Sequence, residues 1–181
     1  MGLPRLENRA ARRLFLKRHG LLDQPSGPGK GGDLAAVIDG LGFVQLDSVN
    51  TVARAHDLIL FSRRPTYRPH HLKRLYEQDR ALFEHWTHDA AMIPMAFYPH
   101  WHLRFERDAE VLRGRWESWR GHTFDHRFDP ILNHIREHGP VCSGDLADGT
   151  PRKGTGWWDW HPSKTALEYL WRSGALTVTG R

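Results

Sequence analysis

The chain has 181 residues, of which 39% are hydrophobic and 26% charged, a balance typical of a soluble globular protein with one large or two small domains. No apolar run reaches the roughly 20 residues that span a bilayer. We expect no secretory signal, and the single cysteine excludes an internal disulfide. The formal net charge of +5 favours a polyanionic partner, although many basic proteins bind no nucleic acid.

Helical periodicity and capping residues divide the first part of the chain. A loop rich in Gly and Pro separates the first two predicted helices, and Asp33 is placed to cap the second. Pro69 begins a basic helix that is followed by a predicted hairpin. The predicted helices cover residues 7–19, 33–41, 53–61, 69–77 and 97–119.

The pattern restarts at residue 124. A helix, a short helix and a third helix ended by Gly174 precede a predicted strand at residues 175–179. This is the order of a winged helix-turn-helix, and residues 69–93 are typical of an earlier copy. We therefore predict a mostly α fold with small β-hairpins, arranged as a tandem winged helix-turn-helix.

The predicted domain boundary lies between residues 123 and 124. Residues 1–123 would form an N-terminal winged-helix region, and residues 124–181 a second winged helix-turn-helix that is truncated in its wing. A hairpin needs two strands, and no return strand follows Thr179. We therefore expect the chain to be the N-terminal portion of a longer protein.

Two polar side chains stand out in the segment FVQLDSVN at residues 43–50. In an extended strand, Phe43, Gln45 and Asp47 would point to the same side. A solvated strand face explains this pattern, but Asp is disfavoured within strands, which favours a special role. An amide and a carboxylate so placed could hold one water between them or flank a cationic sugar.

Thirteen histidines raise the question of a metal site. Neither HExxH nor CxxC occurs in the sequence, and His85 and His88 would point to opposite faces of a strand. We therefore predict no metal and no cofactor, and we interpret the histidines as solvated or facing nucleic acid.

Four segments carry a resemblance to a known family: QLDSVNTVAR with the following LILFSR, EHWTHDAAMIP, GPVCSGDL and PRKGTGWWDWHPSKTALEYLWRSG. In this order they resemble the winged-helix DNA glycosylases of the YcaQ/AlkZ family, most closely the YcaQ type (also called AlkX), which unhooks interstrand crosslinks. The family's catalytic motif is Gln, an apolar residue, then Gln or Asp. Here it reads Gln45-Leu46-Asp47, the form associated with the crosslink-acting branch.

The resemblance implies a monofunctional DNA glycosylase that hydrolyses the N-glycosidic bond of N7-alkylated purines. Alkylation at N7 makes the base cationic and a good leaving group, so the enzyme needs a negative charge near C1′ and a placed water. Asp47 would stabilise the sugar cation and accept a proton from water. Gln45 would orient that water. No metal or cofactor is required.

Further site residues are predicted with their alternatives. Glu84 and His88 share the predicted strand face of Trp86 and are candidate active-site residues, while a hydrogen-bonded structural role for His88 is left open. For each predicted DNA contact, the alternative is a solvated charge. The predicted DNA-binding residues are Arg152, Lys153, Lys164, His161 and Lys73.

The predicted partner is double-stranded DNA that carries alkylated purines or crosslinks. We expect a bacterial, cytoplasmic and nucleoid-associated protein that contacts no membrane and is monomeric at full length. The alternative function is a non-enzymatic winged-helix transcriptional regulator, which has no need for Gln45 and Asp47 on one face. A metal-dependent nuclease would need a carboxylate cluster that the sequence does not assemble.

Overall fold

The computed structural model describes residues 5–120, 125–146 and 162–181, including the backbone but not the side chains of 117–120. The chain forms two compact units. Unit 1 comprises Met1–Tyr98 together with Gly180–Arg181, and unit 2 comprises Pro99–Thr179. Within the described ranges, no helix is long and apolar enough to cross a membrane.

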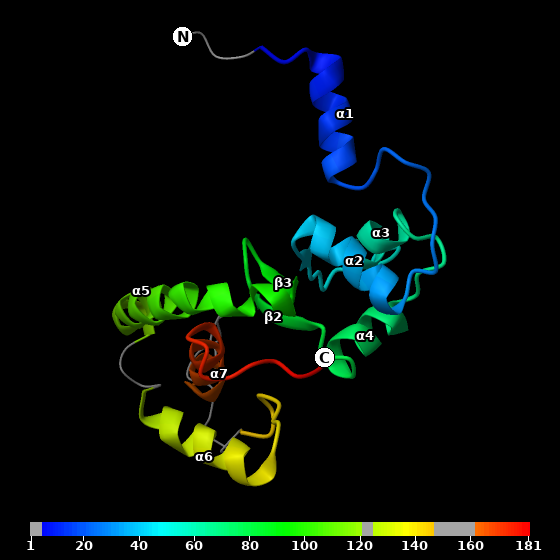
Figure 1. Cartoon of the computed structure of the whole chain (residues 1–181). Helices are drawn as coiled ribbons and strands as arrows, with labels where there is room; N and C mark the ends of the chain where they lie inside the picture. Colours follow the sequence, from blue (N-terminus) through cyan, green and yellow to red (C-terminus); the bar gives the residue numbers. More distant parts are fainter. Residues whose placement is uncertain (1–4, 121–124, 147–161) are drawn as a thin grey trace. The chain divides into compact units, whose positions relative to one another are not determined.

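Unit 1 combines short helices with one small antiparallel sheet (Figure 1). The helix α2 packs against α4 and β3, α3 packs against β1, and α4 packs against β2. In chain order the elements are α1 (Asn8–Arg18), α2 (Gly31–Leu41), β1 (Val44–Gln45), α3 (Ala55–Phe61), α4 (Pro69–Glu77), β2 (Leu82–Trp86) and β3 (Ala90–Pro94).

The sheet has the strand order β1-β3-β2, so β3 lies in the middle. Val44 pairs with Met92, and the backbone N–H of Leu46 donates to the carbonyl of Ala90 (2.8 Å), one residue beyond β1. Leu34 and Ile38 are fully buried, as expected of residues four apart on one helix face. These contacts fix β1 between a helical layer and the hairpin.

The start of α2 differs from the sequence prediction. Asp33 lies in the first turn of the helix, whereas the N-cap position is Lys30. The Asp33 carboxylate accepts hydrogen bonds from the backbone of Gly29 (2.8 Å) and from Nε of Arg64 (2.9 Å). The Arg64 guanidinium holds the pKa of Asp33 below its usual value. Asp33 therefore closes a loop instead of capping the helix.

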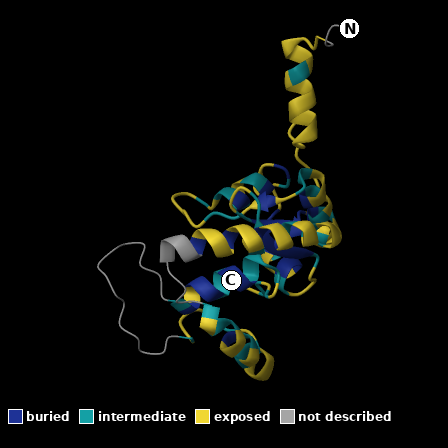
Figure 2. Ribbon diagram, turned by 90° about the vertical axis from the view of Figure 1, so that its left-hand side faces the viewer, coloured by how far each residue is buried: buried dark blue, intermediate teal, exposed yellow. Residues whose placement is uncertain are grey.

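The N-terminal helix α1 contrasts with the rest of unit 1 because none of its residues is buried (Figure 2). The side chains of Leu14 and Phe15 are 49% and 61% exposed. Its end is tied to the unit by Arg63, whose Nε donates to the carbonyl of His19 (2.8 Å). The predicted amphipathic helix thus forms, but its apolar face is largely uncovered.

Unit 2 is built from helices, has no strand among its described residues, and has a separate core. Phe128 stacks on Tyr169 with ring centroids 4.9 Å apart, and Tyr169 donates to the carbonyl of Ala109 (3.2 Å). The buried core residues are Leu112, Trp116, Ile131, Ala166, Tyr169 and Leu170. The elements are α5 (His102–Arg120), η2 (Asp125–Arg127), α6 (Phe128–His138) and α7 (Pro162–Arg172), and η1 (Met95–Trp101) joins the two units.

The expectation of a mostly helical chain with small antiparallel β elements is confirmed. The predicted strand at residues 175–179 is wrong, since these residues form no strand. A strand exists only where a neighbour completes its hydrogen-bond ladder. After this segment, the chain returns to unit 1 at Gly180 and Arg181.

Candidate active site

A pocket of about 750 Å³ in unit 1 is lined by all three residues of the Gln-Leu-Asp motif. Gln45 ends β1, and Asp47 lies in the loop that follows it. The walls come from the segment after β1, from α3, α4 and β3, and from Arg181. The pocket therefore collects residues that are widely separated in the sequence.

The strand predicted at residues 43–48 is shorter than expected. Assigned pairing stops at Gln45, and the last ladder bond comes from the N–H of Leu46. Beyond it, the N–H of Asp47 donates to Nδ1 of His56 (3.1 Å), and Oδ1 of Asp47 accepts from the N–H of Val49 (2.8 Å). Asp47 thus reaches the pocket through a side-chain-closed turn instead of through strand alternation.

His56 holds the backbone of Asp47 from the first turn of α3. Its side chain is buried, and Nδ1 accepts the Asp47 bond, so the neutral ring carries its proton on Nε2. Nε2 lies 3.9 Å from Oδ2 of Asp57. Burial lowers the pKa of His56 despite this carboxylate. The environment therefore favours the neutral ring that the hydrogen bond requires.

Two cations of the pocket, Arg181 and Lys73, are matched by carboxylates, whereas Arg54 is not among the described ion pairs. Arg181 forms a bidentate pair with Glu84, with Nη2 to Oε1 at 2.6 Å and Nε to Oε2 at 2.8 Å. Glu84 hydrogen-bonding raises the pKa of Arg181. Lys73 lies 3.7 Å from Oε2 of Glu77, although its side chain is 62% exposed. Much of the local charge is thus neutralised within the protein.

Asp47 and Gln45 differ from these paired groups. Among the described residues, Oδ2 of Asp47 and the side-chain amide of Gln45 form no hydrogen bond. Gln45 is exposed and Asp47 is half-buried. The two side chains can therefore bind a water molecule or substrate that enters the pocket.

The other candidate residues of the hairpin occupy separate places. Glu84 is buried in β2, where its carboxylate binds Arg181. His88 lies exposed in the turn after Trp86, so the predicted shared strand face is wrong. The strand ends there because the turn closes from the N–H of Thr87 to the carbonyl of Asp89 (2.8 Å).

The residues predicted to contact DNA do not all lie in the same unit. Lys73 lines the pocket from α4, whereas Lys164 is exposed on α7 of unit 2. Arg152, Lys153 and His161 lie outside the described residues.

Sequence reasoning missed His56 and Arg181. His56 follows the motif closely enough to have been considered, but Arg181 meets Glu84 across 97 positions and carries no local signal.

Metal-binding residues do not cluster in the described ranges: no group of three or more His, Cys, Asp or Glu side chains is placed to hold an ion.

An amide and a carboxylate share this pocket with Arg and Lys side chains, a combination that can bind a polar or charged ligand. A family model described as DNA glycosylase AlkZ-like matches residues 38–181, so the chain belongs to this family of DNA glycosylases. Its class is therefore that of hydrolases that act on DNA in repair. A search of solved structures finds no significant match.

Proposed function

We propose that the chain hydrolyses the N-glycosidic bond of N7-alkylated purines in double-stranded DNA, including those that form interstrand crosslinks. The observation that carries the proposal is the convergence of Gln45 and Asp47 on one pocket of a DNA glycosylase family member. Asp at the third motif position favours the YcaQ (AlkX) type. The pocket is open to solvent on the side of exposed Gln45, which suits a lesion too bulky for a closed base pocket.

The chemistry needs charge and positioning more than acid catalysis. An N7-alkylated purine is cationic, so bond cleavage leaves a neutral base and an oxocarbenium-like sugar. A carboxylate beside C1′ stabilises that cation. A water molecule held on the same side then adds to C1′ and transfers a proton to the carboxylate.

Each residue near the motif has a proposed role. Asp47 supplies the carboxylate through Oδ2, because the turn bond from Val49 engages Oδ1. Gln45 orients the water through its amide, which both donates and accepts. His56 keeps the Asp47 backbone in place through the 3.1 Å bond to Nδ1. The reaction is proposed to be monofunctional, and Lys73, which lines the pocket, lies 3.7 Å from Oε2 of Glu77.

We further propose that unit 1 contains a winged helix. The element order α2, β1, α3, α4, β2, β3 and the strand order β1-β3-β2 support this assignment. The helix before the hairpin, α4, would then face the DNA groove. It carries His70, Lys73 and Arg74. A second winged helix-turn-helix over residues 124–181 stays a proposal on the sequence pattern.

The test is the release of N7-methylguanine from methylated duplex DNA, measured by mass spectrometry with and without EDTA. We expect release of the free base that EDTA does not affect, and strand breaks only after alkali. A crosslinked duplex assayed in parallel tests unhooking. Strand cleavage without base release, or the absence of any base release, would contradict the proposal. Strand cleavage before alkali would contradict the monofunctional assignment alone.

A further inference from the structure

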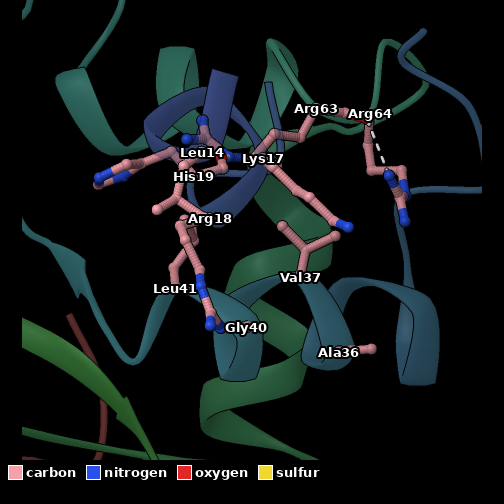
Figure 3. Close-up of a pocket in the computed structure, with 11 residues that line it drawn as sticks. Leu14, Lys17, Arg18, His19, Ala36, Val37, Gly40, Leu41, Arg63 and Arg64 are labelled. Atoms are coloured by element: carbon pink, nitrogen blue, oxygen red, sulfur yellow. Dashed lines mark hydrogen bonds between the residues drawn. The ribbon is translucent and has the colours of Figure 1, made fainter. Parts of the chain in front are cut away.

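A second pocket of unit 1 has a different chemical character from the first. It has a volume of about 550 Å³ and lies between the C-terminal end of α1, the helix α2 and the residues that follow α3 (Figure 3). Its charged lining consists of Lys17, Arg18, Arg63 and Arg64, joined by His19. None of the described residues that line it is Asp or Glu.

Arg63 is the key observation in this pocket. The residue is only 8% exposed, yet its guanidinium bonds neutral oxygens: the carbonyls of His19 (2.8 Å) and Ile59 (2.7 Å) and the hydroxyl of Ser62 (3.1 Å). In the described part of the chain no carboxylate pairs with it. Burial lowers its pKa. A buried charge without a counter-charge is costly, so an anion that reaches it is strongly favoured.

The surroundings add positive charge. Within the described ranges, Lys17 and Arg18 have no carboxylate partner either, and α1 contains no acidic residue. Arg64 differs because Asp33 neutralises it. The carbonyl end of α1 contributes only about half a negative charge. The excess of positive charge therefore remains in the pocket.

The apolar residues of the pocket narrow the class of ligand. Leu14, Val37 and Leu41 lie beside the cationic groups. Apolar lining lowers the local dielectric and strengthens charge pairing. A charged group attached to a compact body with apolar C–H faces fits such a lining, as the phosphate and deoxyribose of a DNA strand do.

We infer that this pocket binds a backbone phosphate of the DNA, outside the catalytic pocket and independently of base sequence. The inference rests on the proposed function for its choice of DNA as the partner. The basic end of α1 precedes the segment that matches the family model, which starts at residue 38. Lys17 and Arg18 therefore lie outside the matched region, whereas Arg63 and Arg64 lie within it.

The experiment measures the affinity for undamaged duplex DNA by fluorescence anisotropy over a series of salt concentrations. The double variant Lys17→Ala with Arg18→Ala removes two exposed cations and leaves the fold intact. We expect roughly tenfold weaker binding and a log–log salt slope that is lower by about 0.9 for each phosphate that the variant no longer neutralises. Arg63→Gln, checked for folding by thermal melting, should weaken binding in the same direction.

The matched control is Arg9→Ala with Arg13→Ala, which removes the same charge from the same helix but outside this pocket. An equal loss of affinity in both double variants would overturn the site, because diffuse attraction would then explain it. The site would also be overturned if the Lys17→Ala with Arg18→Ala variant bound DNA as well as the original chain and lost only its binding to inorganic phosphate or to vesicles with anionic lipids. Base release is scored separately: its absence contradicts the proposed function, whereas an unchanged salt slope contradicts the pocket.

Discussion

The two pockets of unit 1 differ in what neutralises their arginines. In the motif pocket, Arg181 is held by Glu84 in a bidentate pair. In the basic pocket, Arg63 bonds only neutral oxygens among the described residues. Both pockets belong to the same compact unit and are lined by several cations.

This difference separates two tasks. Where internal carboxylates balance most of the cations, a further carboxylate such as Asp47 can stabilise positive charge that develops in a substrate. Where most of the cations have no carboxylate partner, the excess positive charge attracts a phosphate and does no chemistry. Catalysis and backbone binding are thus expected to respond to different substitutions.

The largest expected effect is at Asp47. Asp47→Asn keeps the shape and removes the charge, so base release should fall on the order of 100-fold or more while DNA affinity changes little. Gln45→Ala should cost less because an amide positions water without supplying charge. Single-turnover rates and anisotropy measured on the same protein test this. Activity of Asp47→Asn within a few-fold of the original chain would remove Asp47 from the mechanism.

The next effect concerns stability and the pairing of Arg181. Arg181→Ala removes the bidentate partner of the Glu84 carboxylate, whose side chain is 0% exposed, and leaves that charge buried and unpaired by Arg181. The variant should therefore lower the free energy of unfolding by about 2 kcal/mol. Glu84→Gln should cost less, because the Arg181 side chain is 59% exposed and keeps its hydration. Urea denaturation measures both. Equal stability of the two variants would show that the buried Glu84 carboxylate does not depend on Arg181. The contrast between a carboxylate-paired Arg181 and an Arg63 that bonds only neutral oxygens would then have no energetic support.

A smaller effect is expected at His56. His56→Leu removes the acceptor for the Asp47 N–H and should slow base release by roughly tenfold. His56→Asn places an amide oxygen near the position of Nδ1 and should restore most of the rate. Binding to the basic pocket should be unaffected in both. Equal rates for the Leu and Asn variants would show that the hydrogen bond does not position Asp47.

The smallest effect is a pH dependence of stability. The pKa of His56 in the folded state lies below its usual value near 6.5. The stability linked to its neutral form is therefore present above about pH 6.5 and is lost as pH falls through the folded-state pKa.

We expect a loss of stability below about 1 kcal/mol between pH 7 and 5.5, reduced in His56→Asn. The pKa of His71 is also lowered, so this residue could titrate in the same range. The variant His71→Asn is therefore the control that separates its contribution from that of His56. The measurement is the melting temperature of the original chain and of both variants across this pH range. An identical pH slope in the original chain and His56→Asn would exclude His56 as the group that titrates.

The helices α1 to α4 were predictable from the sequence to within about two residues, whereas the short helix predicted before α7 is a turn in its described part. The helix α4 begins and ends where Pro69 and the apolar spacing predict. The helix α2 ends at Leu41, just before Gly42, whose φ of +84° favours glycine. The spatial arrangement of the site residues was harder to predict from the sequence. The side chains of Gln45 and Asp47 share a pocket, but by way of a turn held by His56 and not through a longer strand.

The sequence by itself determined what local interactions encode. Helical spacing reports contacts three and four residues apart, and the Gln-Leu-Asp motif fixes which groups are available for chemistry. Only the tertiary structure decided the partners. Three features depend on which distant segment lies beside the residues concerned. They are the pairing of Arg181 with Glu84, the shortening of β1 and the absence of a strand at residues 175–179. Strand ladders and long-range ion pairs need that neighbour, and no local pattern specifies it.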